Sequence, residues 1–94
     1  MVIKHTKHFL YKLENLFASS EYMLRYEKGN FKSGYCVLND AKIVIVNKYF
    51  PLEGKINALI DILIELNLDP EDFKEKANHD FLTELRQTQI KFWK

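Results

Sequence analysis

The side chains that could bind a metal ion or attack a substrate are few in this sequence and lie far apart. His5 and His8 are three residues apart, a spacing that places two imidazole rings on one side of a helix. A zinc site needs three or four ligands, and the other candidates, Glu14, Cys36 and His79, form no compact cluster with them in the sequence. We therefore interpret the two histidines as part of a solvated helix end. The sequence predicts no metal site and no cofactor.

Cys36 is the candidate nucleophile. A thiol becomes reactive when a histidine or a helix N-terminus stabilises its thiolate. Cys36 instead lies between Tyr35 and Val37 in an apolar stretch, where a small buried side chain is expected, and no catalytic-cysteine motif surrounds it. A small cysteine-dependent enzyme stays an alternative, although a function without catalysis is favoured. A single cysteine forms no internal disulfide, which favours a reducing cytoplasm.

Aromatic and basic side chains in the middle of the chain could bind single-stranded nucleic acid. On a sheet, aromatic rings can stack on bases while lysines contact phosphates. The residues that could form this surface are Tyr26, Lys28, Phe31, Lys32, Tyr35, Lys42 and Lys48. The formal net charge of the chain is only +1, which is little for a nucleic-acid-binding domain. We therefore keep nucleic-acid binding as an alternative function.

The hydrophobic pattern predicts a single α+β domain over residues 1–94. A helix is expected at 6–20, with Thr6 as its N-cap, because large apolar side chains recur there on one face. Strands are expected at 22–28, 35–38 and 42–48. Helices are expected at 53–67 and then at 70–76 and 79–92, with a break near Asn78. Short connections between the strands favour a three-stranded antiparallel β-meander packed with helices, in the order α-β-β-β-α-α.

The third expected strand is apolar on both faces. Ile43 and Ile45 point to one side, and Val44 and Val46 point to the other. A strand with one side in water should alternate apolar and polar residues. This strand is therefore central in the sheet, or its second face is covered by a helix or a partner chain. We favour a non-enzymatic protein-interaction module that self-associates as a homodimer.

Three short segments of the chain resemble a small bacterial family of uncharacterised proteins. They are residues 25–31 (RYEKGNF), 34–38 (GYCVL) and 46–48 (VNK), within about residues 24–63. No activity is known for that family, so the resemblance implies a bacterial cytoplasmic protein but no functional residue. A cytoplasmic protein without membrane contact is also expected because no stretch approaches the roughly 18–20 apolar residues of a membrane span, and the first residues do not resemble a signal peptide.

Overall fold

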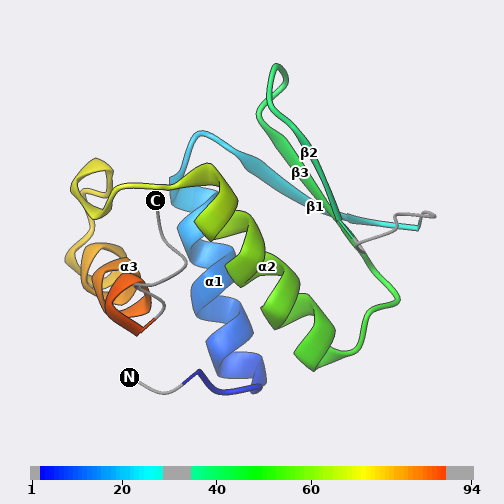
Figure 1. Cartoon of the computed structure of the whole chain (residues 1–94), viewed down its shortest axis with the longest axis horizontal. Helices are drawn as coiled ribbons and strands as arrows, with labels where there is room; N and C mark the ends of the chain where they lie inside the picture. The colour runs from blue at the N-terminus through cyan, green and yellow to red at the C-terminus, as the bar shows by residue number, and fades with distance from the viewer. Residues whose placement is uncertain (1–2, 29–34, 89–94) are drawn as a thin grey trace.

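In a computed structural model of the chain, the helices lie on one side of a three-stranded mixed sheet (Figure 1). The structure describes residues 3–28 and 35–88. The strands are β1 (Met23–Glu27), β2 (Tyr35–Leu38) and β3 (Ile43–Asn47). The helices are α1 (Lys7–Ser19), α2 (Leu52–Leu66), the short 3-10 helix η1 (Pro70–Asp72) and α3 (Lys76–Thr88). The chain is therefore an α+β protein.

The strand order in the sheet is β1-β3-β2, so the expected antiparallel meander is wrong. β2 and β3 form an antiparallel pair in which Leu38 lies opposite Ile43. β1 pairs with the other side of β3 and runs parallel to it, with Met23 opposite Ile43 and Glu27 opposite Asn47. The expectation failed because the connection from β1 to β3 contains β2 itself and is long enough for a parallel pair. In this order the most apolar strand has a neighbour on each side.

The central position of β3 confirms one of the two explanations offered for its two apolar faces. Val44 and Val46 are fully buried, in the same core as the apolar sides of α1 and α2. Ile43 and Ile45 are half-buried on the opposite face. The described helices all lie on the Val44 side of the sheet, with α1 and α2 next to it and α3 packed against α1 on the far side (Figure 1). Within residues 3–28 and 35–88, helices therefore cover one face of the sheet and leave the other open.

Local capping interactions fix where α1 begins and where α2 ends. The Thr6 hydroxyl oxygen accepts a hydrogen bond from the Phe9 N–H at 3.1 Å, which confirms Thr6 as the N-cap of α1. α2 ends at Asn67, whose left-handed backbone (φ 51°, ψ 48°) lets its N–H bond back to the last turn. Within the described residues, every helix is too short or too polar to span a bilayer.

The helix expected at 70–76 is a single 3-10 turn. Asp69 caps it as expected, because its Oδ1 accepts from the Glu71 N–H at 3.0 Å. Phe73 then adopts an extended backbone (φ −102°, ψ 119°) and buries its ring in the core, so the helix cannot continue through it. The burial of one aromatic side chain has overridden the local helical preference.

The break expected near Asn78 is also wrong, because Asn78 lies inside α3. Its side chain is buried, and Nδ2 donates to Ser19 Oγ at 2.9 Å and to Glu75 Oε2 at 3.1 Å. This asparagine therefore ties the start of α3 to the end of α1. The expected end of the helix, at 89–92, lies outside the described residues.

Candidate functional site

The three described lysines of the expected nucleic-acid surface lie at two opposite ends of the sheet. Lys28 follows β1 and Lys48 follows β3, and these ends are adjacent because the two strands are parallel. Lys42 precedes β3 at the other end, where its Nζ lies 5.1 Å from the centre of the Tyr22 ring. Phe31 and Lys32 lie outside the described residues, as does the side chain of Tyr35, whose backbone begins β2.

Tyr26, the remaining aromatic residue of that set, faces the helices rather than solvent. Its hydroxyl donates to Glu14 Oε2 of α1 at 2.5 Å, and Lys55 Nζ of α2 lies 5.2 Å from the centre of its ring. Burial, and then the hydrogen bond and the charge of Glu14, raise the pKa of Tyr26 above its ordinary value of 10.0. The phenol therefore stays protonated at neutral pH and acts as a hydrogen-bond donor, not as a base.

A groove of about 550 Å³, which we call the β1 groove, runs between the edge strand β1 and α1. It is lined by Glu14 and Ala18 of α1, by residues 20–24, and by Tyr26. Two of these residues, Glu14 and Glu21, are acidic, and no lysine or arginine of the described chain lines it. The sequence analysis missed this groove, because nothing in the sequence places α1 beside β1.

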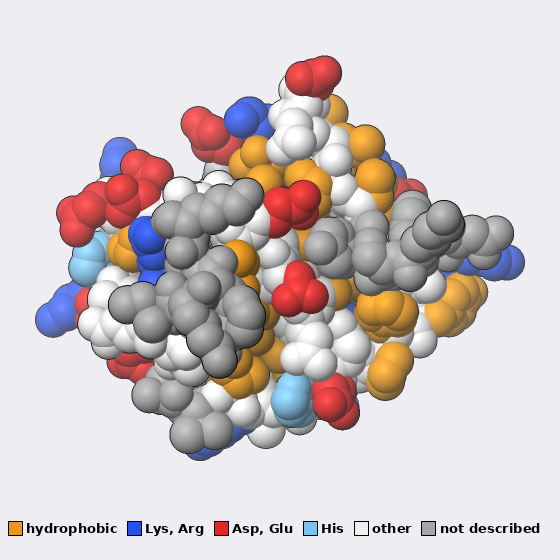
Figure 2. Space-filling view, in the orientation of Figure 1, with side chains coloured by type: hydrophobic (Ala, Val, Ile, Leu, Met, Phe, Trp, Pro, Cys, Tyr) orange, Lys and Arg blue, Asp and Glu red, His pale blue; other side chains and the backbone are white. Residues whose placement is uncertain are grey.

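The open side of the sheet, which we call the outer sheet face, presents its side chains in rows across the three strands. The rows follow from the register and are Met23, Ile43 and Leu38, then Arg25, Ile45 and Cys36, then Glu27 and Asn47. The first row is entirely apolar and leaves 62% of Met23 and 43% of Leu38 exposed. Hydrophobic side chains also reach the surface along the β2–β3 hairpin at the top of the view in Figure 2.

The other end of the outer sheet face is charged, and its middle holds the single cysteine. Arg25 Nη2 and Glu27 Oε1 form an ion pair at 3.3 Å. Cys36 is half-buried on this face, so the expectation of a buried cysteine is wrong. In the described part of the chain, the side chains of His5 and His79 bond to residues other than Cys36. Along the outer sheet face, an apolar row, a half-buried cysteine and an ion pair therefore follow one another.

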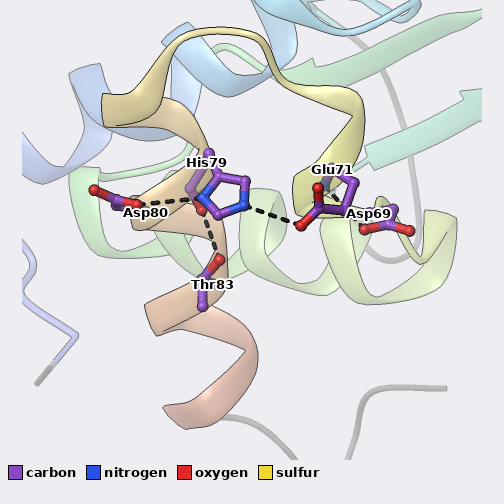
Figure 3. Close-up of polar contacts among 5 residues, drawn as sticks. All are labelled: Asp69, Glu71, His79, Asp80 and Thr83. Carbon is purple, nitrogen blue, oxygen red and sulfur yellow. Dashed lines mark hydrogen bonds and ion pairs between the residues drawn. The ribbon is translucent and has the colours of Figure 1, made fainter.

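A cluster of charged side chains surrounds His79, near the start of α3 (Figure 3). Its Nδ1 lies 3.2 Å from Asp80 Oδ1, and its Nε2 lies 3.3 Å from Glu71 Oε1 of η1. The hydrogen bonds to Asp80 and then Glu71 raise the pKa of His79 above 6.5. When His79 is protonated, its ring bridges Glu71 of η1 and Asp80 of α3.

The His79 cluster is not arranged to hold a metal ion. Its two carboxylates contact opposite nitrogens of the ring, so the donor atoms do not converge on one point. Across residues 3–28 and 35–88, no group of three or more histidine, cysteine or acidic side chains could hold a metal ion.

Comparisons with protein-family models, with curated proteins and with solved structures find no match for this chain. The resemblance to a bacterial family of uncharacterised proteins therefore stays a prediction. The function has to be argued from the two surfaces that the geometry offers, the outer sheet face and the β1 groove. One is apolar with a charged end, and the other borders β1, an edge strand of the described sheet.

Proposed function

We propose that this chain is a non-enzymatic protein-interaction module that self-associates through the outer sheet face. The single observation that carries the proposal is the open apolar row of Met23, Ile43 and Leu38, two of whose side chains are largely exposed. An antiparallel or mixed sheet can leave one face in water, but that face is then normally polar. Contact with another molecule, which would shield these side chains from water, accounts for an apolar row on this face.

A second copy of the chain is the partner that best complements this face. Two sheets pack face to face at about 10 Å, and a twofold axis places the same residues on both sides of the contact. An axis that runs along the strands brings the apolar row of one copy onto the apolar row of the other, with Ile43 facing Ile43.

The size of the outer sheet face limits the strength of the dimer. Strands of five, four and five residues cover a footprint of roughly 220 Å², from the usual strand spacing and rise. Stable interfaces bury about 800 Å² on each partner, so the sheet face alone supports a weak, reversible dimer. We therefore expect monomer and dimer to exchange at micromolar or higher concentrations.

Sedimentation equilibrium from ~10 µM to ~1 mM tests the proposal, because this range spans weak dimer dissociation. The double variant Met23→Lys and Leu38→Lys places two charges in the apolar row and should leave the protein monomeric throughout. The matched control Tyr11→Lys changes a side chain that is 60% exposed on α1, away from this face, and should still dimerise. A wild-type monomer at the highest concentration, or equal loss of dimer in the control, contradicts the proposal.

Binding of single-stranded nucleic acid has less support as a second function. The Tyr26 ring is held between Glu14 and Lys55 on the helix side of the sheet, where a base could stack only after these contacts break. Lys42 also lies at the opposite end of the sheet from Lys28 and Lys48. A salt-sensitive shift of a fluorescent oligothymidine at 50 mM salt, lost in Lys28→Ala with Lys48→Ala, would reverse this preference.

A further inference from the structure

The outward edge of β1 is a row of backbone groups that point away from the sheet, beside the β1 groove. The Met23 N–H donates to the Lys42 carbonyl at 2.8 Å, and the Glu27 carbonyl accepts from the Lys48 N–H at 3.1 Å. Alternate residues of β1 therefore face β3, and the residues between them face the opposite way. The N–H and C=O groups of Leu24 and Tyr26 thus point outward, where a further strand can pair with them.

One side of α1 lies where an added strand would need support. Tyr11, Glu14 and Ala18 occupy positions i, i+3 and i+7 of α1, which places them on one side of the helix. Tyr11 and Ala18 are exposed, and Glu14 is held towards β1 by the Tyr26 hydroxyl. A strand added at the usual spacing of about 4.8 Å beyond β1 would rest alternate side chains on this side of α1. The edge and its support together form a slot for an extended chain.

The charge of the β1 groove selects among the peptides that could enter it. Glu14 and Glu21 line the groove. Lys42 Nζ lies 3.8 Å from Glu21 Oε2. Because the Glu21 side chain is 83% exposed, this surface ion pair is weak. The lining therefore carries negative charge that a basic side chain can neutralise.

From these observations we propose that the β1 groove binds an extended peptide segment of another protein. The segment adds to β1 as a fourth strand, pairs with the backbone of Leu24 and Tyr26, and places a lysine or arginine beside Glu14 and Glu21. This site uses the edge of the sheet and one side of α1, whereas self-association uses the outer sheet face. Met23 borders both surfaces, but the pairing groups of Leu24 and Tyr26 belong to the strand edge, so either contact can fail without the other.

Amide hydrogen exchange with a defined peptide tests strand addition directly. The probe is a seven-residue peptide of alternating valine and arginine with both ends blocked. At saturation it should slow exchange of the Leu24 and Tyr26 amides by at least about tenfold, because both become hydrogen-bonded. A matched peptide of valine and glutamate should bind at least about tenfold more weakly because of like-charge repulsion. A version of the valine–arginine peptide that is N-methylated at alternate residues, along the edge that would pair with β1, should not bind. The methyl groups remove the backbone N–H donors of the peptide and leave the protein unchanged.

Variants in the groove test the choice of a basic partner. Glu14→Gln with Glu21→Gln keeps an acceptor for the Tyr26 hydroxyl but removes both charges, and should weaken the arginine probe by about tenfold. The matched control Glu65→Gln with Glu84→Gln removes two exposed charges from α2 and α3 and should bind as the wild type does. Equal binding of both peptides, insensitivity to N-methylation, no binding at ~1 mM, or unchanged exchange of the two amides would overturn the proposal. An increase in the protection of the Leu24 and Tyr26 amides with protein concentration, in the absence of peptide, would also overturn the proposal. β1 would then pair with β1 of a second copy.

Discussion

Replacing Tyr26 by phenylalanine removes the one hydroxyl that ties β1 to α1 while keeping the ring and its contact with Lys55. A hydrogen bond to a charged group contributes about 1.5–3 kcal/mol. Glu14 is half-buried and regains water when the hydroxyl is lost, so we expect the free energy of unfolding to fall by about 1–2 kcal/mol. At an m-value of about 1.5 kcal/mol/M, the midpoint of urea unfolding falls by about 1 M.

The matched control for this variant is Tyr22→Phe. The Tyr22 hydroxyl donates to Asn39 Oδ1 at 3.3 Å in an exposed contact, so its removal should change stability by less than about 0.5 kcal/mol. Equal effects of the two variants would refute the importance of the Tyr26–Glu14 contact. A double-mutant cycle with Glu14→Gln measures the coupling between the two side chains, which we expect to account for most of the loss.

Stability at high pH gives a second measurement on the same contact. Unfolded tyrosine loses its proton near pH 10.0, whereas burial and Glu14 raise the pKa of Tyr26 in the folded chain. Above pH 10 the folded chain binds more protons than the unfolded chain, so this stabilisation is full below pH 10 and is lost as the pH rises towards the folded pKa. The slope is less than about 1.4 kcal/mol per pH unit, because Tyr26 is only half-buried. The gap between wild type and Tyr26→Phe should therefore narrow above pH 10, and a constant gap contradicts the assignment.

Two further changes test the contacts at the start of α3. Glu71→Gln should lower the pKa of His79 towards 6.5 in an NMR titration, whereas Glu84→Gln should leave it unchanged. His79 contributes stability that is full below pH 6.5 and is lost as the pH rises through its raised folded pKa, so in Glu71→Gln the loss is smaller and is complete at a lower pH. Asn78→Ala removes two buried hydrogen bonds and should cost about 1–3 kcal/mol in urea unfolding. The exposed control Gln87→Ala should cost less than about 0.5 kcal/mol, and an equal cost would show that the bonds of Asn78 contribute nothing.

Local chemistry made α1, α2 and the three strands of this chain predictable, but not the way the strands pair or how the chain runs from residue 70 to residue 78. Thr6 and the strand at 35–38 were found because capping and β-propensity act over a few residues. The choice between β1 next to β2 and β1 next to β3 depends on burial of the whole sheet, which no short segment encodes. Phe73 illustrates the same limit, since the core and not its neighbours ends the turn there.

The facing of side chains was predictable in one strand and not in another. In β1, Leu24 and Tyr26 alternate with Arg25 and polar Glu27, so the pattern already placed Tyr26 on the inner side, and its use in a nucleic-acid surface ignored that pattern. In β2, apolar residues occupy both alternating positions, and the sequence alone cannot tell which side faces the helices. Cys36 was therefore expected in the core and lies on the outer sheet face.

The parallel pairing of β1 with β3 has a consequence during synthesis. Glu27 pairs with Asn47, so the partner of each β1 residue is made 47 − 27 = 20 residues later. At a synthesis rate of about 5–20 residues per second, β1 leaves the ribosome roughly 1–4 s before β3 is available to pair with it. The β2–β3 hairpin, whose partners lie much closer in sequence, can form as soon as β3 emerges. The nascent β1 segment therefore spends its first seconds without either of its edges satisfied, and a chaperone that captures extended chains would meet it in that interval.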